Sequence, residues 1–164
     1  MHRSLRLLPA LALPGIALAV LVGPGASAQD GATRTLTLKE LDKGSTFTHV
    51  RNTKGAPSRS NMQGDVIAFV NPMADPSGQL VGKLHVSCVT TVGARNFLKS
   101  VIDCAGAIVL RDGTLTLQTV VSLDSDTTTG AITGGTGAYA NARGTFVSKQ
   151  EPHGGSQDTI TLAG

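Results

Sequence analysis

Apolar and polar residues alternate in two consecutive runs of the sequence, QLVGKLHVSCVTTV (residues 79–92) and FLKSVIDCAGAIVL (residues 97–110). In the first run, one face carries the apolar residues and the other carries Lys83 and His85. A period of two is typical of a β-strand with one buried face. Residues 93–96 form a turn-like segment between the runs, so the pattern predicts two neighbouring antiparallel strands.

The same pattern continues along most of the chain, with Gly, Pro, Asn and Asp marking the turns. Further strands are expected at residues 34–41, 47–50, 65–71, 114–123, 131–133, 143–150 and 156–162. No segment has the 3.6-residue apolar period of a long helix. The sequence therefore predicts an all-β, antiparallel fold of about eight strands, which is enough to close a β-barrel. Its interior is either filled by side chains or holds one small ligand.

The chain has two cysteines, and both lie on the apolar faces of the two central runs. Cys88 belongs to residues 79–92 and Cys104 to residues 97–110. A cross-strand disulfide is geometrically reasonable if these runs pair, and it would stabilise the fold by roughly 3 kcal/mol on the chain-entropy model. We expect the Cys88–Cys104 bridge, because the chain is expected to be exported. The alternative is that Cys88 stays reduced as a pocket thiol.

Residues 1–28 have the features of a secretory signal peptide. Arginines precede an apolar run over residues 7–22, and Ala-Ser-Ala at residues 26–28 forms a small-x-small cleavage pattern. The run is shorter than the roughly 20 residues of a membrane span and contains two prolines, so no stable membrane anchor is expected. We expect a secreted protein with one mature domain, residues 29–164.

Charge and motif content argue against several functions. The 14 Lys and Arg residues fall to 12 against 11 Asp and Glu residues once Arg3 and Arg6 leave with the signal. No basic cluster remains, so no nucleic-acid partner is expected. The glycine-rich residues 134–137 lack the ending of a phosphate-binding loop, and the mature histidines lack a shared zinc-site spacing. We expect no metal and no cofactor.

Several short segments occur in the order and at the distances of one superfamily. They are DKGS (42–45), GDVIAFVN (64–71), VG (81–82) followed by Cys88-Val89, TGGTGAY (133–139) and ARG (142–144). With this set, the mature chain resembles the allene oxide cyclase and dirigent superfamily. The resemblance implies an eight-stranded, calycin-like barrel, often trimeric, with a largely apolar cavity. Its members steer the cyclisation or coupling of reactive lipophilic molecules without cofactors, and similar bacterial barrels include pericyclic cyclases of polyketide products.

The first expected strand can face the barrel in two ways. Counting back from the Gly-Ser turn places Thr37 and Lys39 at positions of a pocket Glu and a pocket Asn in the plant cyclases. In this orientation the steering carboxylate of those enzymes is missing, Leu36 and Leu38 face outward, and Lys39 could polarise a substrate carbonyl. The hydrophobic periodicity favours the reverse orientation, with both leucines in the core and Lys39 in solvent.

The resemblance assigns further positions. Asn71 and Phe69 match a pocket Asn and its neighbouring Phe, Cys88 matches a pocket Cys, and Arg143 matches the dirigent Ala-Arg-Gly segment. Asn71 could equally be a turn residue, and Tyr139 could reach the cavity mouth or pack beside the glycine turn. The candidate catalytic residues are Lys39, Asn71 and Arg143. The candidate ligand-binding residues are Thr37, Phe69, Leu84, Val86, Cys88, Ile102 and Tyr139.

Three functions fit these observations. The leading hypothesis is an exported, cofactor-independent cyclase or isomerase that holds a hydrophobic, polyene- or polyketide-like molecule in a dry cavity. The alternatives are a non-catalytic, dirigent-like or carrier barrel for an apolar ligand, and a secreted structural domain with a filled interior. A cavity of at least about 300 Å³ separates the first two from the third. A homo-oligomer, dimer or trimer, is compatible with each, and residues 51–64 are a candidate lid.

Overall fold

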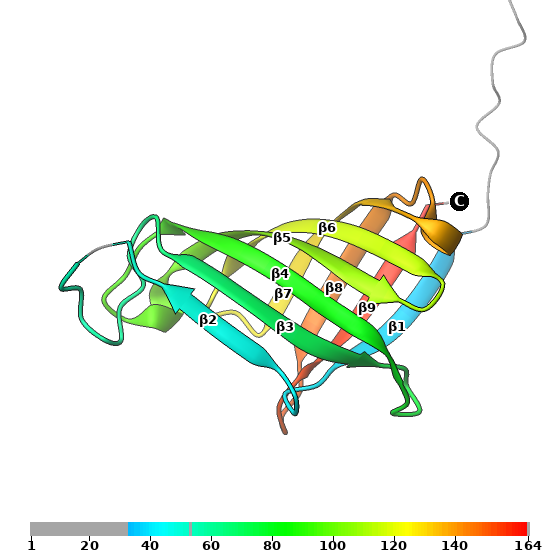
Figure 1. Cartoon of the computed structure of the whole chain (residues 1–164), viewed down its shortest axis with the longest axis horizontal. Coiled ribbons are helices and arrows are strands. Elements are labelled where there is room, and N and C mark those ends of the chain that lie inside the picture. Colours follow the sequence, from blue (N-terminus) through cyan, green and yellow to red (C-terminus); the bar gives the residue numbers. More distant parts are fainter. Residues whose placement is uncertain (1–32, 53, 164) are drawn as a thin grey trace, which may run out of the picture.

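Nine antiparallel strands form one sheet that curls into a tilted barrel in the computed structural model, which describes residues 33–52 and 54–163 (Figure 1). The predicted signal peptide, residues 1–28, lies outside the described residues. Within the described ranges, no helix is long and apolar enough to cross a membrane. The strands are β1 (Arg34–Glu40), β2 (Thr46–Val50), β3 (Val66–Ala74), β4 (Leu80–Val92), β5 (Val101–Leu110), β6 (Gly113–Ser122), β7 (Thr127–Gly135), β8 (Gly144–Gln150) and β9 (Ser156–Leu162). Two single 3₁₀ turns, η1 (Phe97–Lys99) and η2 (Gly137–Tyr139), complete the described elements.

Eight of these strands close the barrel, and β2 is an additional edge strand. The order is β1-β9-β8-β7-β6-β5-β4-β3-β2, and β1 also pairs with the end of β3 through Lys39 opposite Ala74 and Glu40 opposite Met73. The short strand β2 pairs only with the first half of β3. The predicted all-β, eight-stranded antiparallel barrel is therefore confirmed.

The strand β3 changes its partner at Pro72. The sequence pattern predicted an end at residue 71, but β3 continues to Ala74. Proline has no N–H group to donate, so it is tolerated where the ladder on that edge is interrupted. Pro72 stands where the edge of β3 passes from β2 to β1, and its carbonyl accepts a hydrogen bond of 3.0 Å from the Leu41 N–H. The change of partner therefore accommodates the proline within the strand.

The strand β7 is longer than the sequence pattern predicted. It spans Thr127–Gly135 rather than residues 131–133. Its glycines hide the apolar alternation, because glycine offers no side chain to either face. Gly130 is required by packing, since a Cβ atom at this position would overlap the ring of Phe146 on β8.

Large apolar side chains fill one end of the barrel interior, where β1 begins and β9 ends. We call this region the packed end; its buried residues are Leu38, Met73, Leu115, Ile132, Ile160 and Leu162. Tyr139 in η2 is buried against it, with the guanidinium carbon of Arg34 lying 5.2 Å from the ring centroid. Burial of these aliphatic side chains is the main source of stability in this half of the barrel.

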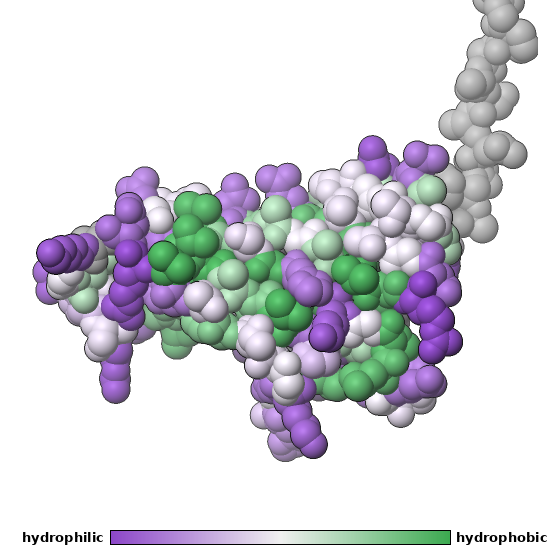
Figure 2. Space-filling view, in the orientation of Figure 1, coloured by the Kyte–Doolittle hydropathy of each residue, from purple (hydrophilic) through white to green (hydrophobic). Residues whose placement is uncertain are grey.

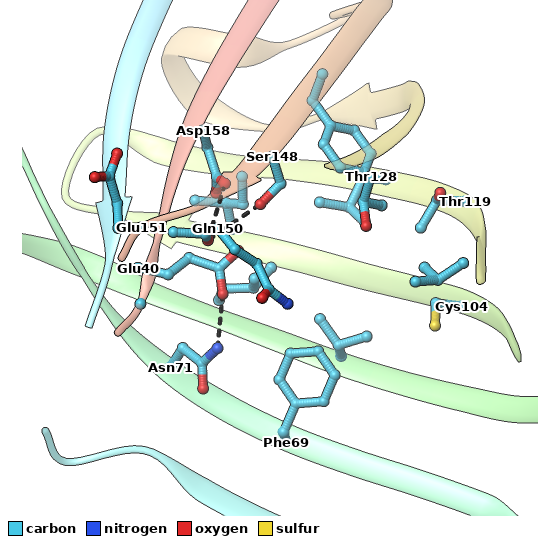
Figure 3. Close-up of a pocket in the computed structure, with 18 of the residues that line it drawn as sticks. Glu40, Phe69, Asn71, Cys104, Thr119, Thr128, Ser148, Gln150, Glu151 and Asp158 are labelled. Carbon is cyan, nitrogen blue, oxygen red and sulfur yellow. Dashed lines mark hydrogen bonds between the residues drawn. The ribbon is translucent and has the colours of Figure 1, made fainter. Parts of the chain in front are cut away.

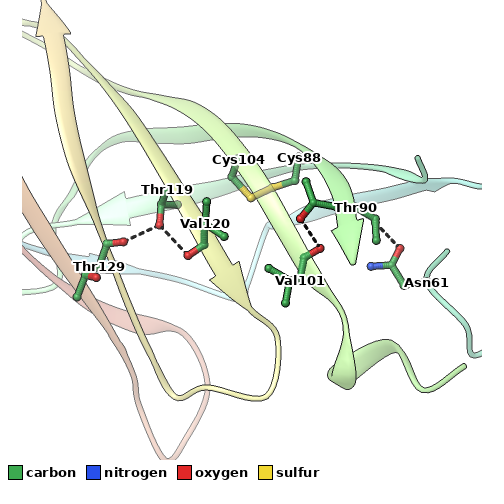
Figure 4. Close-up of a disulfide and its surroundings, with 9 residues drawn as sticks. Asn61, Cys88, Thr90, Val101, Cys104, Thr119, Val120 and Thr129 are labelled. Carbon is green, nitrogen blue, oxygen red and sulfur yellow. Dashed lines mark hydrogen bonds between the residues drawn. A yellow bond between two sulfur atoms is a disulfide. The ribbon is translucent and has the colours of Figure 1, made fainter. Parts of the chain in front are cut away.

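The predicted disulfide lies inside the barrel, toward its other end. Cys88 on β4 and Cys104 on β5 stand directly opposite each other and are joined (Figure 4). Both cysteines are buried. Because both sulfur atoms are in the bridge, the alternative of a reduced pocket thiol at Cys88 does not apply to this structure.

The loop between β2 and β3 is held to the barrel by buried polar residues. Asn61 accepts a 2.8 Å hydrogen bond from the Thr90 hydroxyl (Figure 4). Its amide also donates a hydrogen bond of 2.8 Å to the Ser100 hydroxyl. The carboxylate of Asp65 accepts hydrogen bonds from the backbone N–H groups of Asn52 (2.7 Å) and Met62 (2.9 Å). The described part of this loop is therefore attached at both of its ends, and its role as a lid stays a prediction.

The outer surface of the barrel carries exposed hydrophobic side chains. Figure 2 shows them interspersed with polar residues over the face formed by β2–β5. Among the exposed large hydrophobic residues on these strands are Val50, Leu80, Val89 and Val109. This apolar outer face is separate from the interior, because successive side chains of a strand point to opposite faces.

Candidate functional site

A cavity of about 430 Å³ occupies the barrel interior beyond the packed end. This volume lies in the range of small-molecule sites. The interior is therefore not entirely filled by side chains, as it would be in the secreted structural domain considered above. The large apolar residues of the cavity lining are Phe69, Leu84, Val86, Ile102, Ile108, Leu117, Val121, Leu123, Phe146 and Ile160.

A polar cluster lies at one side of this cavity, on β1, β3, β8 and β9. Figure 3 shows the side chains of Glu40, Asn71 and Asp158 turned toward one another. The Asn71 amide donates a hydrogen bond of 2.6 Å to Oε2 of Glu40. The Ser148 hydroxyl lies 3.1 Å from that of Ser156, which in turn lies 3.5 Å from Oδ1 of Asp158. The cluster therefore joins two carboxyl groups, one amide and two hydroxyl groups.

The strand alternation explains why these carboxyl groups point inward. On β1, Glu40 shares the face of Leu38, which packs in the core. On β9, Asp158 shares the face of Ile160, which is fully buried. Each carboxyl group thus points into the barrel, like the aliphatic residue two positions away on the same strand. The alternation of the strand sets the direction of the side chain, and an acidic residue at such a position brings a charge into the interior.

Burial perturbs the acidity of one of these groups. Only 3% of Asp158 is exposed to solvent. Burial, and then the negative charge of nearby Glu40, raise the pKa of Asp158 from 3.8 to about 7. Both effects disfavour a second negative charge in the cluster. Near neutral pH, Asp158 can therefore hold a proton, which it can donate to a ligand or take back from one.

The rim of the cavity is also acidic. Asp42, Asp126 and Glu151, from three different turns, line it together with Gly155. Gly155 has a φ of 77°, and a Cβ atom there would overlap the carbonyl oxygen of Glu40, so glycine brings the β8–β9 turn close to β1. In the described part of the chain, no group of three His, Cys, Asp or Glu side chains is placed to hold a metal ion.

Five of the sequence-predicted site residues lie together on the cavity wall. They are Phe69, Asn71, Leu84, Val86 and Ile102. Asn71 is a residue of β3 rather than a turn residue, and its amide holds Glu40. Of the two bridged cysteines, Cys104 lines the cavity, whereas Cys88 is buried behind it.

The other predicted site residues lie away from the cavity. Thr37 and Lys39 are on the opposite face of β1 from Leu38, and the Lys39 ammonium group donates to the Pro76 carbonyl at 3.3 Å. The periodicity-based orientation of this strand is thus the observed one, and the orientation counted back from the turn is wrong. The exposed Arg143 donates to the carbonyl of Ala142 at 2.8 Å, and Tyr139 packs at the opposite end of the barrel.

The two carboxyl groups of the site, Glu40 and Asp158, were not among the residues predicted from the sequence. A steering carboxylate was expected to be absent, but Glu40 lines the cavity only one residue after Lys39. The signal that could have identified both acids is the alternation of inward and outward positions along each strand. Glu40 continues the alternation of Leu36 and Leu38, and Asp158 that of Ile160 and Leu162. A charged residue at an inward strand position is a candidate site residue, because its burial is costly unless it is partnered.

Sequence comparisons leave the chain without a match: no model of a known family matches it, and neither does any curated protein. Solved structures do match. A pyocyanin demethylase superposes with a TM-score of 0.61 at 24% identity, covering 80% of this chain and 99% of that protein. A pterocarpan synthase dirigent protein gives a TM-score of 0.54 at 17% identity, covering 80% and 92%.

Ring-forming enzymes are similar in structure as well. A Diels-Alderase from Streptomyces koyangensis superposes with a TM-score of 0.56 at 13% identity, over 79% of this chain and 63% of that enzyme. At such identities, the likeness concerns the fold. Together with the strand order and the closed interior described above, these matches show that the chain has the same barrel fold as these proteins, dirigent proteins and Diels-Alderases among them.

Proposed function

We propose that this protein is an exported, cofactor-independent cyclase or isomerase that binds a hydrophobic small molecule in the barrel cavity and steers its ring closure. A polyene- or polyketide-like chain is the substrate class. The observation that supports the proposal is the lining of the cavity: apolar walls lead to one polar cluster, in which Asp158 lies beside Glu40 and can hold a proton near neutral pH.

The chemistry follows from this arrangement. Apolar walls that include Phe69 and Ile102 hold a flexible chain in a folded, reactive conformer, so that part of the entropy of ring closure is lost on binding rather than in the reaction. The protonated carboxyl group of the pair donates a hydrogen bond to a substrate carbonyl and stabilises the charge that develops there. Asn71 positions Glu40 through the 2.6 Å hydrogen bond. No covalent bond to the protein is needed, and in an isomerisation the pair returns the proton that it receives.

Further observations support parts of this proposal. The buried disulfide is consistent with export to an oxidising compartment, as the sequence of residues 1–28 predicts. Structures named as Diels-Alderases share the fold. The hydrophobic outer face over β2–β5 supports a homo-oligomer, a dimer or trimer, because exposed apolar patches of this kind occur at interfaces.

A carrier or dirigent-like barrel that binds an apolar ligand without catalysis is the second candidate. The observation that favours it is the confinement of the polar cluster to one side of a cavity with otherwise apolar walls. In this function, Glu40 and Asp158 would only orient the ligand.

A turnover experiment distinguishes the two functions. The purified mature chain is incubated with a linear triene ketone that cyclises slowly without a catalyst, and the products are quantified by chiral chromatography. We expect at least tenfold acceleration with one stereoisomer in excess, and loss of most of this acceleration in Asp158→Asn, because the amide cannot act as a general acid. Asp103→Asn is the matched control, because Asp103 lies on the outer face of β5 opposite Val89.

The outcome is informative in either direction. Stereochemical bias without acceleration favours the dirigent-like function. Products that match those formed without protein, in both rate and stereochemistry, would show that the chain is not a cyclase for this substrate class.

A further inference from the structure

We infer that the cavity takes a lipophilic cation, an apolar ring system or chain that carries a quaternary or protonated nitrogen, and that it rejects lipophilic carboxylates. This inference rests on the proposed ligand-binding function of the cavity, and it narrows the ligand class.

The charges that face the cavity all have one sign. Glu40 and Asp158 lie in the interior cluster, and Asp42, Asp126 and Glu151 lie at the rim. Among the described residues that line the cavity, none is Lys, Arg or His. An anionic ligand would therefore meet only like charges on its way in, whereas a cation would be attracted from the rim to the interior.

Among the described residues, no cationic side chain is paired with the buried carboxyl group of Asp158. Only 3% of Asp158 is exposed, and its partners are the hydroxyl groups of Ser156 (3.5 Å) and Ser148 and the neighbouring acid Glu40. Glu40 is itself held by the neutral amide of Asn71. Buried carboxylates in proteins are normally paired with a cation or hydrogen-bonded to several donors. A ligand cation in the cavity would provide the missing charge.

The walls suit the apolar part of such a ligand. Phe69 on β3 and Phe146 on β8 both line the cavity, and these strands are not neighbours in the barrel. A cation in contact with an aromatic face gains a favourable interaction with the ring quadrupole. The cavity therefore combines apolar walls, aromatic faces and negative charge, which together match a lipophilic cation better than a neutral or an anionic molecule.

Three fluorescent probes of similar size test the inference on the mature chain at pH 7.5: 9-aminoacridine, a cation; N-phenyl-1-naphthylamine, which is neutral; and 8-anilino-1-naphthalenesulfonate, an anion. We expect the dissociation constant of the cation to be at least tenfold lower than that of the anion. Asp158→Asn should weaken binding of the cation about tenfold and change binding of the neutral probe by less than twofold.

Matched variants separate a local effect from an effect of net charge. Asp103→Asn makes the same change of charge on the outer face of β5 and should leave all three dissociation constants unchanged. Glu40→Gln provides a second substitution in the cluster, and it should raise the dissociation constant of the cation, as Asp158→Asn does. Near-ultraviolet circular dichroism verifies that each variant is folded.

Two results would overturn the inference. Binding of the anion as tight as that of the cation, or equal effects of Asp158→Asn and Asp103→Asn, would reject the charge selectivity while leaving the cavity as a site for hydrophobic ligands. Failure of all three probes to bind would reject the selectivity and the proposed ligand-binding function together.

Discussion

The two ends of the barrel interior are built from the same strands and the same alternation, but one is solid and the other is hollow. At the packed end, inward positions hold Leu38, Leu115 and Leu162, which fill the space between the strands. Farther along β1 and β9, the inward positions hold Glu40 and Asp158 beside the cavity. The difference shows that backbone closure alone does not create a binding site. The size and polarity of the inward residues decide whether a section of the barrel is core or cavity.

The same substitution at each end provides the largest contrast. Leu115→Ala should lower the free energy of unfolding by about 4 kcal/mol, because Leu115 is 0% exposed and its removal leaves a void. Leu84→Ala should cost about 2 kcal/mol, because Leu84 already borders the cavity on one side. Urea unfolding followed by circular dichroism measures both values. Equal losses would contradict the division of the interior into a packed end and a cavity.

A pH series tests the charged side of the comparison. The pKa of Asp158 is raised from 3.8 to about 7 in the folded chain, so the folded state binds more protons than the unfolded state between these values. Stability from this group is complete below about pH 4 and is lost as the pH rises toward 7. We expect a decrease on the order of 3 kcal/mol in the free energy of unfolding over this window.

Asp158→Asn isolates this contribution. The amide does not titrate, so unfolding of the variant should be nearly independent of pH between 4 and 7, apart from effects that the wild type shares. Parallel profiles for wild type and variant would show that Asp158 does not hold its proton in the folded state.

The smallest effect is expected on the outer face of β1. Lys39 lies between Leu38 of the packed end and Glu40 of the cavity, but its side chain belongs to neither region. Lys39→Ala should therefore change the free energy of unfolding by less than about 0.5 kcal/mol. Binding of a neutral fluorescent probe should stay unchanged within twofold. Loss of binding would show that this lysine reaches the ligand after all.

The sequence was sufficient for the architecture and insufficient for the chemistry. Local alternation predicted most strands, and it placed Cys88 and Cys104 on facing positions, because both features depend on nearest neighbours along and across strands. It predicted neither the continuation of β3 through Pro72 nor the full length of β7, because these depend on a change of partner and on the space that Gly130 leaves for Phe146.

The candidate site was predicted only in part, because its residues come together through closure of the barrel. Phe69 and Asn71 were identified from a resemblance over one strand. The side chains of Glu40 and Asp158 lie close together because β1 and β9 are neighbours in the barrel, although these strands are far apart in the sequence. A long-range pairing of this kind leaves no local pattern, although the alternation that points each acid inward was present in its own strand.

The change of partner along β3, from β2 to β1 at Pro72, has a consequence for how such a barrel can diversify. Closure depends on only two paired positions, so lengthening β2 at the expense of β1, or the reverse, would widen or narrow the aperture. Such a change involves Glu40, which is one of the two closing residues of β1 and also lines the cavity. In a barrel built in this way, the width of the opening and the position of this carboxyl group therefore change together.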